Sequence, residues 1–327
     1  MQVSSDRQWH PSDRLLRHSI LVSTAVLPRS ARVSARRSLL SRLELGRANR
    51  AGLIIVGHPK CGGTWLRVMI SRAFQFRHSI PGHIVAKTDE LHRRNANIPR
   101  LLSTNGSYSY ERIVADALES SPPDPSLSAK PIVLLARHPC DIAVSWYIQF
   151  TKRQSPYKNE LINAELRNPV DRKNVERWEF VMNEELGLPH LIEFFNNWQK
   201  RLATVERPLL VRYEDLRADP IPDLRRIGRI MEAGFTDEEL IEARDFASFD
   251  NLKKLETEGY FRNGGLSLRN RNDPDTFKVR RGKVGGFRDY FEPEQVEKME
   301  RMVRERLWPG FGYSGEEIQD LRGGSAG

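Results

Sequence analysis

A loop with a pair of adjacent glycines, a lysine and a threonine follows the first strongly apolar run of the chain. Residues 57–65 read Gly-His-Pro-Lys-Cys-Gly-Gly-Thr-Trp. Gly62 and Gly63 let the backbone approach an anion, and N–H groups at a helix N-terminus bind phosphate-like oxygens with help from the helix dipole. Lys60 adds a positive charge, and Thr64 adds a hydroxyl donor. The pattern predicts an anion site, with a plain strand-to-helix turn as the alternative.

The loop differs from the Walker A loop of common ATPases and kinases. In that loop the lysine follows the last glycine, as Gly-Lys-Ser/Thr. Here Lys60 precedes the pair Gly62 and Gly63, and Gly-Lys-Ser/Thr occurs nowhere in the chain. The order of residues therefore disfavours an ordinary Walker-type enzyme, although a phosphotransferase with a related fold stays an alternative.

A second segment offers a further phosphate ligand. Residues 137–147 read Arg-His-Pro-Cys-Asp-Ile-Ala-Val-Ser-Trp-Tyr and follow another apolar run. Arg137, at the end of a predicted strand, can bind a phosphate through its fork of N–H donors. Ser145 lies two helical turns further on and can supply a hydroxyl to the same group. Taken alone, Arg137 could equally be a surface ion-pair partner.

Five segments together resemble the sulfotransferases that use 3′-phosphoadenosine 5′-phosphosulfate (PAPS). Residues 59–66 are similar to the family's 5′-phosphosulfate loop, usually Pro-Lys-Ser-Gly-Thr-Thr-Trp, and residues 137–145 to its 3′-phosphate segment, Arg-x-Pro-x-Asp-x-x-x-Ser. The other three segments resemble Tyr-Glu-Asp-Leu at residues 213–216, Thr-Ser-Phe at 247–249, and Arg-Lys-Gly-x-x-Gly-Asp-Trp at 279–287. All five occur in the family's order.

The resemblance implies transfer of a sulfuryl group from PAPS to a hydroxyl or amine of a small-molecule or carbohydrate acceptor. It assigns donor binding to Lys60, Cys61, Gly62, Gly63, Thr64, Trp65, Arg137, Ser145, Tyr213, Ser248, Phe249, Arg280, Arg281 and Gly282. Phe249 is expected to stack on the adenine, and its alternative is a plain core position. Residues 279–287 have a solvated basic loop as their alternative.

Catalysis by this family needs a charge on the leaving oxygen to be stabilised and a proton to be removed from the acceptor. Lys60 suits the first task. Soluble members supply the base from a Lys-Thr-His segment after a strand, and the matching segment here is Lys-Thr-Asp at residues 87–89. The predicted catalytic residues are Lys60, Lys87 and Asp89. Burial must raise the pKa of Asp89 from about 3.9 if it is the base; His92 and His83 are alternatives. A nucleotide-binding protein with weak or lost catalysis is the alternative function.

The chain holds two cysteines, Cys61 and Cys140. Two are too few for a disulfide framework or a four-cysteine zinc site, and they favour a reducing compartment. Cys61 stands where the family has Ser, and a helix N-terminus could lower the pKa of its thiol and make it reactive. The eight histidines are scattered without His-Glu-x-x-His spacing. We therefore predict no metal.

Alternating strands and helices predict an α/β fold in three layers, with a central parallel sheet flanked by helices, of the P-loop nucleotide-binding-like type. Strands are predicted at residues 53–56, 83–87, 132–136 and 209–213. Helices are predicted at residues 62–77, 108–119, after Pro139, and at 190–203, 221–233, 237–247 and 293–307. Residues 151–175 are polar and broken by prolines, which predicts a long excursion over the surface.

Composition bounds the remaining choices. The chain has 327 residues, of which 39% are apolar, and no apolar run approaches the 18 residues of a membrane span. Residues 1–50 hold ten Arg against three acidic residues, a net charge of +7, whereas the remaining 42 Lys and Arg against 40 Asp and Glu leave +2. Because the excess charge is local, nucleic-acid binding by the whole protein is not predicted.

The predicted domains are a basic N-terminal extension at 1–50, a sulfotransferase-like domain at 51–315 and a flexible tail at 316–327. The basic extension resembles an organelle transit peptide in composition. It also suits weak contact with a membrane or another acidic surface, or packing on the body. We expect a cytoplasmic protein and an acceptor that the sequence does not identify, and a homodimer stays open.

Overall fold

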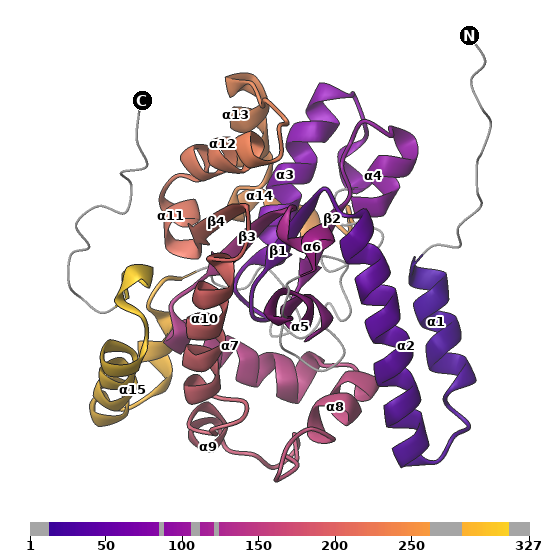
Figure 1. Cartoon of the computed structure of the whole chain (residues 1–327). Helices are drawn as coiled ribbons and strands as arrows, with labels where there is room; N and C mark the ends of the chain where they lie inside the picture. Colours follow the sequence, from indigo (N-terminus) through magenta and orange to yellow (C-terminus); the bar gives the residue numbers. More distant parts are fainter. Residues whose placement is uncertain (1–12, 85–87, 106–111, 121–123, 262–282, 314–327) are drawn as a thin grey trace.

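A four-stranded parallel sheet forms the centre of the computed structural model, which describes residues 13–84, 88–105, 112–120, 124–261 and 283–313 (Figure 1). The strands are β1 (Leu53–Val56), β2 (Leu101–Thr104), β3 (Pro131–Ala136) and β4 (Arg207–Arg212), in the spatial order β2-β1-β3-β4. All three strand pairs are parallel. Every residue of β1 and β3 is buried, as expected for a sheet covered on both faces. The predicted fold class is confirmed.

Helices form the two outer layers. One side of the sheet carries α3 (Gly63–Arg77), α12 (Pro220–Ile230) and α13 (Asp237–Phe246), and the other carries α5 (Ile113–Glu119), α7 (Pro139–Ile148) and α10 (Leu188–Leu202) (Figure 1). The shorter or peripheral helices are α4 (Thr88–Arg94), α6 (Pro125–Ser128), α8 (Pro156–Asn163), α9 (Arg177–Val181), α11 (Tyr213–Ala218), α14 (Phe249–Thr257) and α15 (Pro293–Arg306).

Local signals explain where several helices begin. Proline occupies the first turn of α7, α8, α10, α12 and α15, where its missing N–H costs no hydrogen bond. Thr236 caps α13 and forms a capping box with Glu239. α3 begins at Gly63, and its N-cap Gly62 has no side chain with which to cap it. The N-terminus of α3 is thus left to bind another group.

The predicted strand at residues 83–87 is wrong in its first two residues. A 3₁₀ turn spans Gly82–Ile84, and residues 85–87 lie outside the described residues. The sheet's remaining strand is instead β2, whose Leu101 and Leu102 are buried beside β1. Short apolar runs are ambiguous in sequence, and here pairing with β1 decides which run becomes the strand. The surface excursion predicted at 151–175 is partly helical, because a π-helical turn (Gln149–Arg153) leads into α8.

Two N-terminal helices pack against the body as a hairpin, which was one of the three interpretations of this region. They are α1 (Asp13–Ser23) and α2 (Arg29–Arg50), which lie side by side at the edge of the molecule (Figure 1). Leu40 of α2 packs in a small cluster with Leu161 of α8. Two arginines of α2 bind one carboxylate of α8, with Arg32 Nε and Arg36 Nη1 at 3.1 and 2.8 Å from Glu160. The hairpin therefore holds α8 in place.

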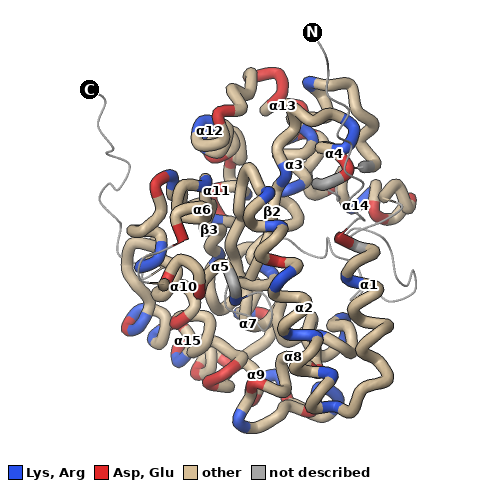
Figure 2. The backbone as a smooth tube through the Cα atoms, turned by 45° about the vertical axis from the view of Figure 1, so that its right-hand side comes forward, with Lys and Arg blue, Asp and Glu red and all other residues tan. Residues whose placement is uncertain are grey.

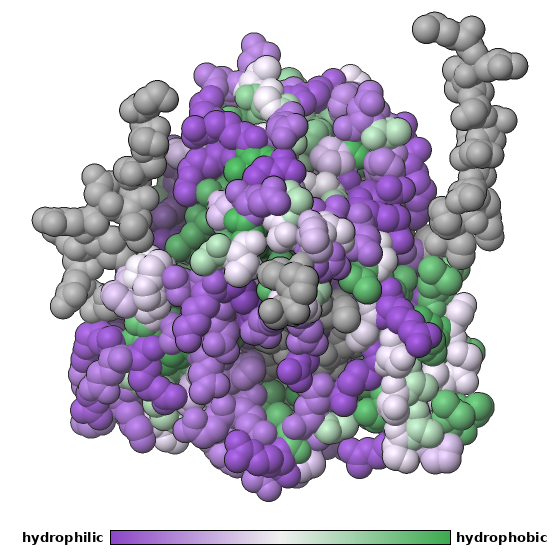
Figure 3. Space-filling model, in the orientation of Figure 1, coloured by the Kyte–Doolittle hydropathy of each residue, from purple (hydrophilic) through white to green (hydrophobic). Residues whose placement is uncertain are grey.

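Charge and hydropathy are unevenly spread over this hairpin. Lys and Arg recur along α2 and α8 (Figure 2), and hydrophobic residues show among polar ones on the side where α1 lies (Figure 3). The exposed large apolar side chains there are Leu15, Leu16, Val22, Val26 and Leu39. None of the helices that the structure describes is long and apolar enough to cross a membrane.

Candidate active site

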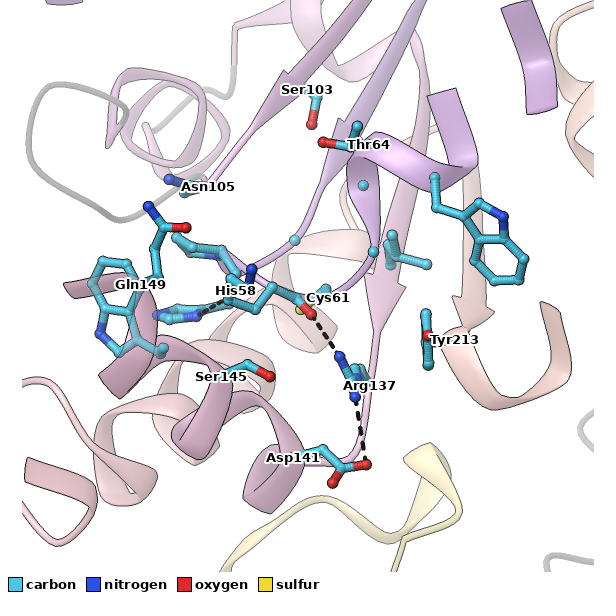
Figure 4. A pocket seen from close by; sticks show the side chains of 18 of the residues that line it. His58, Cys61, Thr64, Ser103, Asn105, Arg137, Asp141, Ser145, Gln149 and Tyr213 are labelled. Atoms are coloured by element: carbon cyan, nitrogen blue, oxygen red, sulfur yellow. Dashed lines mark hydrogen bonds and ion pairs between the residues drawn. The ribbon is translucent and has the colours of Figure 1, made fainter. Parts of the chain in front are cut away.

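The carboxyl ends of the four strands open into one pocket of about 470 Å³. The loop after β1 supplies residues 57–65, β2 supplies Ser103, the loop after β3 supplies Arg137, and Tyr213 follows β4. Figure 4 shows Asn105 at one end of this pocket and Tyr213 at the other, with Cys61 and Arg137 between them. The strand order thus sets the order of side chains along the pocket, from β2 to β4.

The loop after β1 has an unusual backbone. Lys60 has φ of 83° and Gly62 has φ of 99°, both in the left-handed region. Glycine adopts this region freely, whereas lysine does so at a cost. A Cβ on Gly62 would lie 2.7 Å from Cδ2 of Tyr213. The loop therefore needs a glycine at 62 and leaves its backbone open to the pocket.

Arg137 connects three parts of the pocket. Its Nη1 donates to the carbonyl of Lys60 at 3.2 Å, and its Nη2 donates to the carbonyl of Lys283 at 3.4 Å. Its guanidinium carbon lies 4.4 Å from the ring centroid of Tyr213. The buried Nε has no hydrogen-bond partner among the described residues. An arginine with this spare donor, beside a glycine-rich loop, can bind an anion.

Asp141, one turn along α7, positions the segment that faces Arg137. Its carboxylate accepts hydrogen bonds from the backbone N–H groups of Gly285, at 2.9 Å, and Phe287, at 3.0 Å. The same carboxylate lies 3.7 Å from Arg137 Nη2. Asp141 is the Asp of the Arg-x-Pro-x-Asp pattern, and the sequence alone predicted no role for it. Its fixed spacing from Arg137 was the available signal.

Glu214 makes a second connection of this kind. It accepts from the backbone N–H of His138 at 2.9 Å and from the Tyr313 hydroxyl at 2.6 Å. It therefore joins the loop after β3 to the C-terminal part of the described chain. Burial and the adjacent Glu214 charge raise the pKa of Tyr313, so its hydroxyl stays protonated and donates.

Aromatic rings line the end of the pocket nearest β4. The ring centroids of Trp65 and Tyr213 are 5.6 Å apart in an edge-to-face arrangement. Phe249 also lines the pocket, and the Arg217 guanidinium carbon lies 5.7 Å from the ring centroids of both Trp65 and Phe249. Sequence reasoning missed Arg217, although its place one helical turn after Tyr213 was a signal. Trp65, Tyr213 and Phe249 thus place aromatic rings at this end of the pocket, against which a planar base can stack.

Ala247 stands where the resembled segment usually has Thr, and a backbone contact explains why the side chain can differ. Trp65 Nε1 donates to the backbone carbonyl of Ala247 at 2.7 Å. Because the main chain makes this contact, the side chain at 247 does not matter for it. Ser248 precedes α14 as its N-cap, is exposed and is not among the residues that line the pocket. Arg280, Arg281 and Gly282 lie outside the described residues.

Comparison with known proteins identifies the family. A model of the sulfotransferase domain matches residues 51–309. The chain belongs to the sulfotransferase family. It is 26% identical over 286 residues to cytosolic sulfotransferase 12 of Arabidopsis thaliana, covering 80% of this chain and 78% of that relative. It is 27% identical over 286 residues to cytosolic sulfotransferase 7 of the same plant, covering 79% of each.

Solved structures share the fold. A mouse sulfotransferase in complex with PAP aligns with a TM-score of 0.50 at 19% identity, over 78% of this chain and 83% of that one. A retinol dehydratase in complex with retinol and PAP aligns with a TM-score of 0.51 at 16% identity, over 85% and 88%. The protein is thus an enzyme of the PAPS-dependent sulfotransferase family, which transfers a sulfuryl group from PAPS to an acceptor.

The thiol of Cys61 in this sulfotransferase is not activated. The side chain is 1% exposed, and burial raises the pKa of the thiol far more than the nearby Arg137 charge lowers it. The expected lowering by the helix N-terminus is therefore wrong. The backbone N–H of Cys61 donates to the His58 carbonyl at 3.1 Å, which closes the turn before α3.

The catalytic assignment of Lys87 and Asp89 assumed a strand just before them, and the structure has a 3₁₀ turn where that strand was predicted to begin. Lys87 lies outside the described residues, and Asp89 is the second residue of α4 rather than the residue after a strand. The strand that does end at the pocket, β2, delivers Ser103 and is followed by Asn105. His92 Nδ1 donates to the Ile98 carbonyl at 2.8 Å, and the side chain does not line the pocket. The catalytic role of Asp89 stays a prediction.

Ser145 lines the pocket from α7, beside the loop that carries Arg137. His58 also lines it, but burial and the neighbouring His190 hold the pKa of the imidazole well below its usual range. Within the described ranges, no group of three or more His, Cys, Asp or Glu side chains could hold a metal ion.

Proposed function

We propose that the pocket binds PAPS with its adenine at the β4 end, its phosphates over the β1 and β3 loops, and its sulfuryl group directed toward β2. The observation that supports this most is the position of Arg137. It links the carbonyls of Lys60 and Lys283 while covering Tyr213, and so stands where a 3′-phosphate can meet both basic segments. The clearance at Gly62 and the free Nε of Arg137 fit a bound anion.

Transfer in this site follows from the same arrangement. The acceptor hydroxyl or amine forms a bond to sulfur while the bond from sulfur to the 5′-phosphate oxygen breaks, and PAP leaves. Lys60 and the N–H groups at the start of α3 stabilise the charge that grows on the leaving oxygen. Arg137, Ser145 and the segment 280–287 hold the 3′-phosphate. Trp65, Tyr213 and Phe249 hold the base. No step is assigned to a metal, so turnover should persist in excess EDTA.

The proton of the acceptor needs a destination. Asp89 is the proposed base, on the resemblance of residues 87–89 alone. The residue that follows β2 at the pocket is Asn105, and its carboxamide cannot take up the acceptor's proton. This observation favours a second candidate, a PAPS-binding protein with slow turnover. Asp89→Asn tests the base: loss of PAP formation with unchanged PAP binding keeps Asp89 as the base, whereas an unchanged rate removes it without deciding which group replaces it. The parent's own rate of PAP formation decides between the enzyme and the slow-turnover candidate.

The donor assignment is tested by thermal unfolding of the full chain with PAP and, as a matched control, with AMP, which lacks the 3′-phosphate. A ligand at 100 times its Kd adds about 2.7 kcal/mol to the free energy of unfolding. For a chain of this size that is a rise in Tm of at least about 2 °C. A rise with PAP and a smaller one with AMP supports the proposal. Equal shifts, or a shift with ATP alone, contradict it.

Location and other contacts are also proposals. The curated relatives named above are called cytosolic, which supports a cytoplasmic location for this chain. The exposed side chains of Leu15, Val22 and Val26 support weak contact of residues 1–50 with a membrane. Co-sedimentation with anionic vesicles tests that contact, and sedimentation velocity tests a homodimer.

A further inference from the structure

The end of the pocket opposite the adenine is polar. Asn105, Gln149 and Gln154 line it, and Figure 4 shows Asn105 and Gln149 close together at this end. Gln149 Nε2 donates to Gln154 Oε1 at 3.3 Å. Carboxamides both donate and accept hydrogen bonds, which suits recognition of hydroxyl groups.

Two cations accompany these amides. Arg67 reaches the pocket from α3, donating to the Gly63 carbonyl at 3.2 Å and to the Thr64 hydroxyl at 3.3 Å. It has no carboxylate partner among the described residues. Burial and the nearby Arg47 lower the pKa of Arg67 to about 10, so the group is still charged at pH 7. Lys158 reaches the pocket from α8.

The strand order places Arg67 away from the adenine. A Cβ on Gly63 would lie 3.3 Å from Ser103 Oγ, so the start of α3 faces the end of β2. Arg67 lies one turn further along α3 and binds the Gly63 carbonyl. It therefore belongs to the β2 side of the pocket, whereas Tyr213 belongs to the β4 side.

Negative charge is scarce in this pocket. Among the described residues that line it, the one carboxylate is Asp141. Asp141 is already engaged by the backbone of residues 285 and 287 and by Arg137, at the phosphate part of the site. The β2 end thus presents positive charge and hydrogen-bonding groups without a lining carboxylate in the described chain.

We propose that the acceptor is a hydroxyl-rich anion of the acidic-sugar class, with its anionic group against Arg67 and Lys158 and its hydroxyls against the amides. This inference rests on the proposed function. An apolar phenol offers no hydrogen-bond partner to these half-buried amides or charge partner to the guanidinium, whereas hydroxyls and an anion do. An anion instead supplies Arg67 with the carboxylate that the described lining lacks on this side of the pocket.

The experiment uses the full chain saturated with PAP, so that added ligands cannot occupy the donor site. Thermal unfolding is followed during titration with D-glucuronate, D-glucose and 2-naphthol, with sodium chloride matching the ionic strength. We expect glucuronate to raise Tm above the PAP-saturated value at concentrations where glucose has a smaller effect and 2-naphthol has none. Stabilisation by 2-naphthol equal to or above that of glucuronate overturns the inference, and so does an absence of any glucuronate effect.

Two variants locate the anion. Lys158→Gln should weaken glucuronate binding about tenfold, the change expected on losing a charge-assisted hydrogen bond, with glucose binding changed less than twofold. Lys152→Gln is the matched control, because Lys152 is exposed and does not line the pocket. Equal losses in both variants overturn the inference. A normal PAP shift with no glucuronate effect contradicts the acceptor class alone, whereas an absent PAP shift contradicts the proposed function.

Discussion

The donor and acceptor ends of the pocket are built in different ways. At the donor end, loops that follow neighbouring strands meet and are joined by Arg137, Asp141 and Glu214. At the acceptor end, side chains from helices α3 and α8 join Asn105, which follows β2. Ion pairs of α2 with Glu160 hold α8 against the N-terminal hairpin. The donor end is thus a property of the sheet and its loops, and the acceptor end depends on helix packing as well. Damage to one should leave the other largely intact.

The largest expected effect comes from the donor loop. Lys60→Ala should lower the rate of PAP formation from PAPS about 10³-fold, because a preorganised charge on the leaving oxygen is lost. The rate is measured with glucuronate or water as acceptor, and Lys152→Ala controls for loss of a lysine elsewhere. Glucuronate stabilisation of the PAP-saturated variant should persist. A rate within tenfold of the parent contradicts the role of Lys60.

Arg137→Lys tests the hydrogen bonds by which Arg137 connects the two loops of the donor end. A lysine cannot bind two carbonyls and a phosphate with one fork, so PAP affinity should fall about 100-fold. Calorimetric titration with PAP and AMP measures the change. AMP affinity should fall less, because AMP lacks the 3′-phosphate. Equal losses for the two nucleotides would show instead that Arg137 acts only by supporting the loop.

Phe249→Ala tests the aromatic part. Stacking of a base on an aromatic ring contributes about 1–3 kcal/mol, so PAP affinity should fall about tenfold. Phe249→Tyr keeps the ring and should keep the affinity. A lower Tm with unchanged PAP affinity would place Phe249 in the core, the alternative considered from the sequence.

Glu160→Gln should have the smallest effect and act at the other end. The Arg32 hydrogen bond lowers the pKa of Glu160 below its usual value. The ion pair therefore stabilises the fold above the unfolded-state pKa of about 4.5, and that stability is lost as pH falls through the folded-state pKa. We expect a loss of about 1 kcal/mol at pH 7, a smaller loss at pH 4, and weaker glucuronate binding with PAP affinity unchanged.

Glu165→Gln is the matched control for this pair, because its ion pair with Arg37 is more exposed. Unfolding curves between pH 7 and pH 4 compare both variants with the parent. A change in PAP affinity in Glu160→Gln would show that the two ends are coupled through the body, against the independence described above.

The same difference explains what sequence could predict. The donor end was predictable because each of its segments carries its own chemistry in consecutive residues, such as 57–65 and 137–145. Strands β1, β3 and β4 were predicted for the same reason, as apolar runs. β2 was missed because Leu-Leu-Ser-Thr is short and half polar, and its pairing with β1 lies far away in sequence. The catalytic assignment of residues 87–89 assumed a strand just before them and stays a prediction.

The acceptor end was not predictable from local pattern. Arg67 and Lys158 each look like an ordinary surface residue of a helix, and only the fold brings both to the pocket. Glu160 and its partners Arg32 and Arg36 are more than a hundred residues apart. The basic composition of residues 1–50 suggested contact with a membrane or another acidic surface. It gave no sign that Arg32 and Arg36 bind Glu160 of the same chain.

The left-handed backbone at Lys60 has a consequence for laboratory evolution. A non-glycine residue in this conformation costs about 1–2 kcal/mol, and glycine there would relieve that cost at the expense of about 0.5–1 kcal/mol of chain entropy. Lys60→Gly would therefore unfold no more easily than the parent and would be inactive. Variant libraries ranked by heat resistance alone would accept this change. Selections on this enzyme therefore need to measure turnover as well as stability.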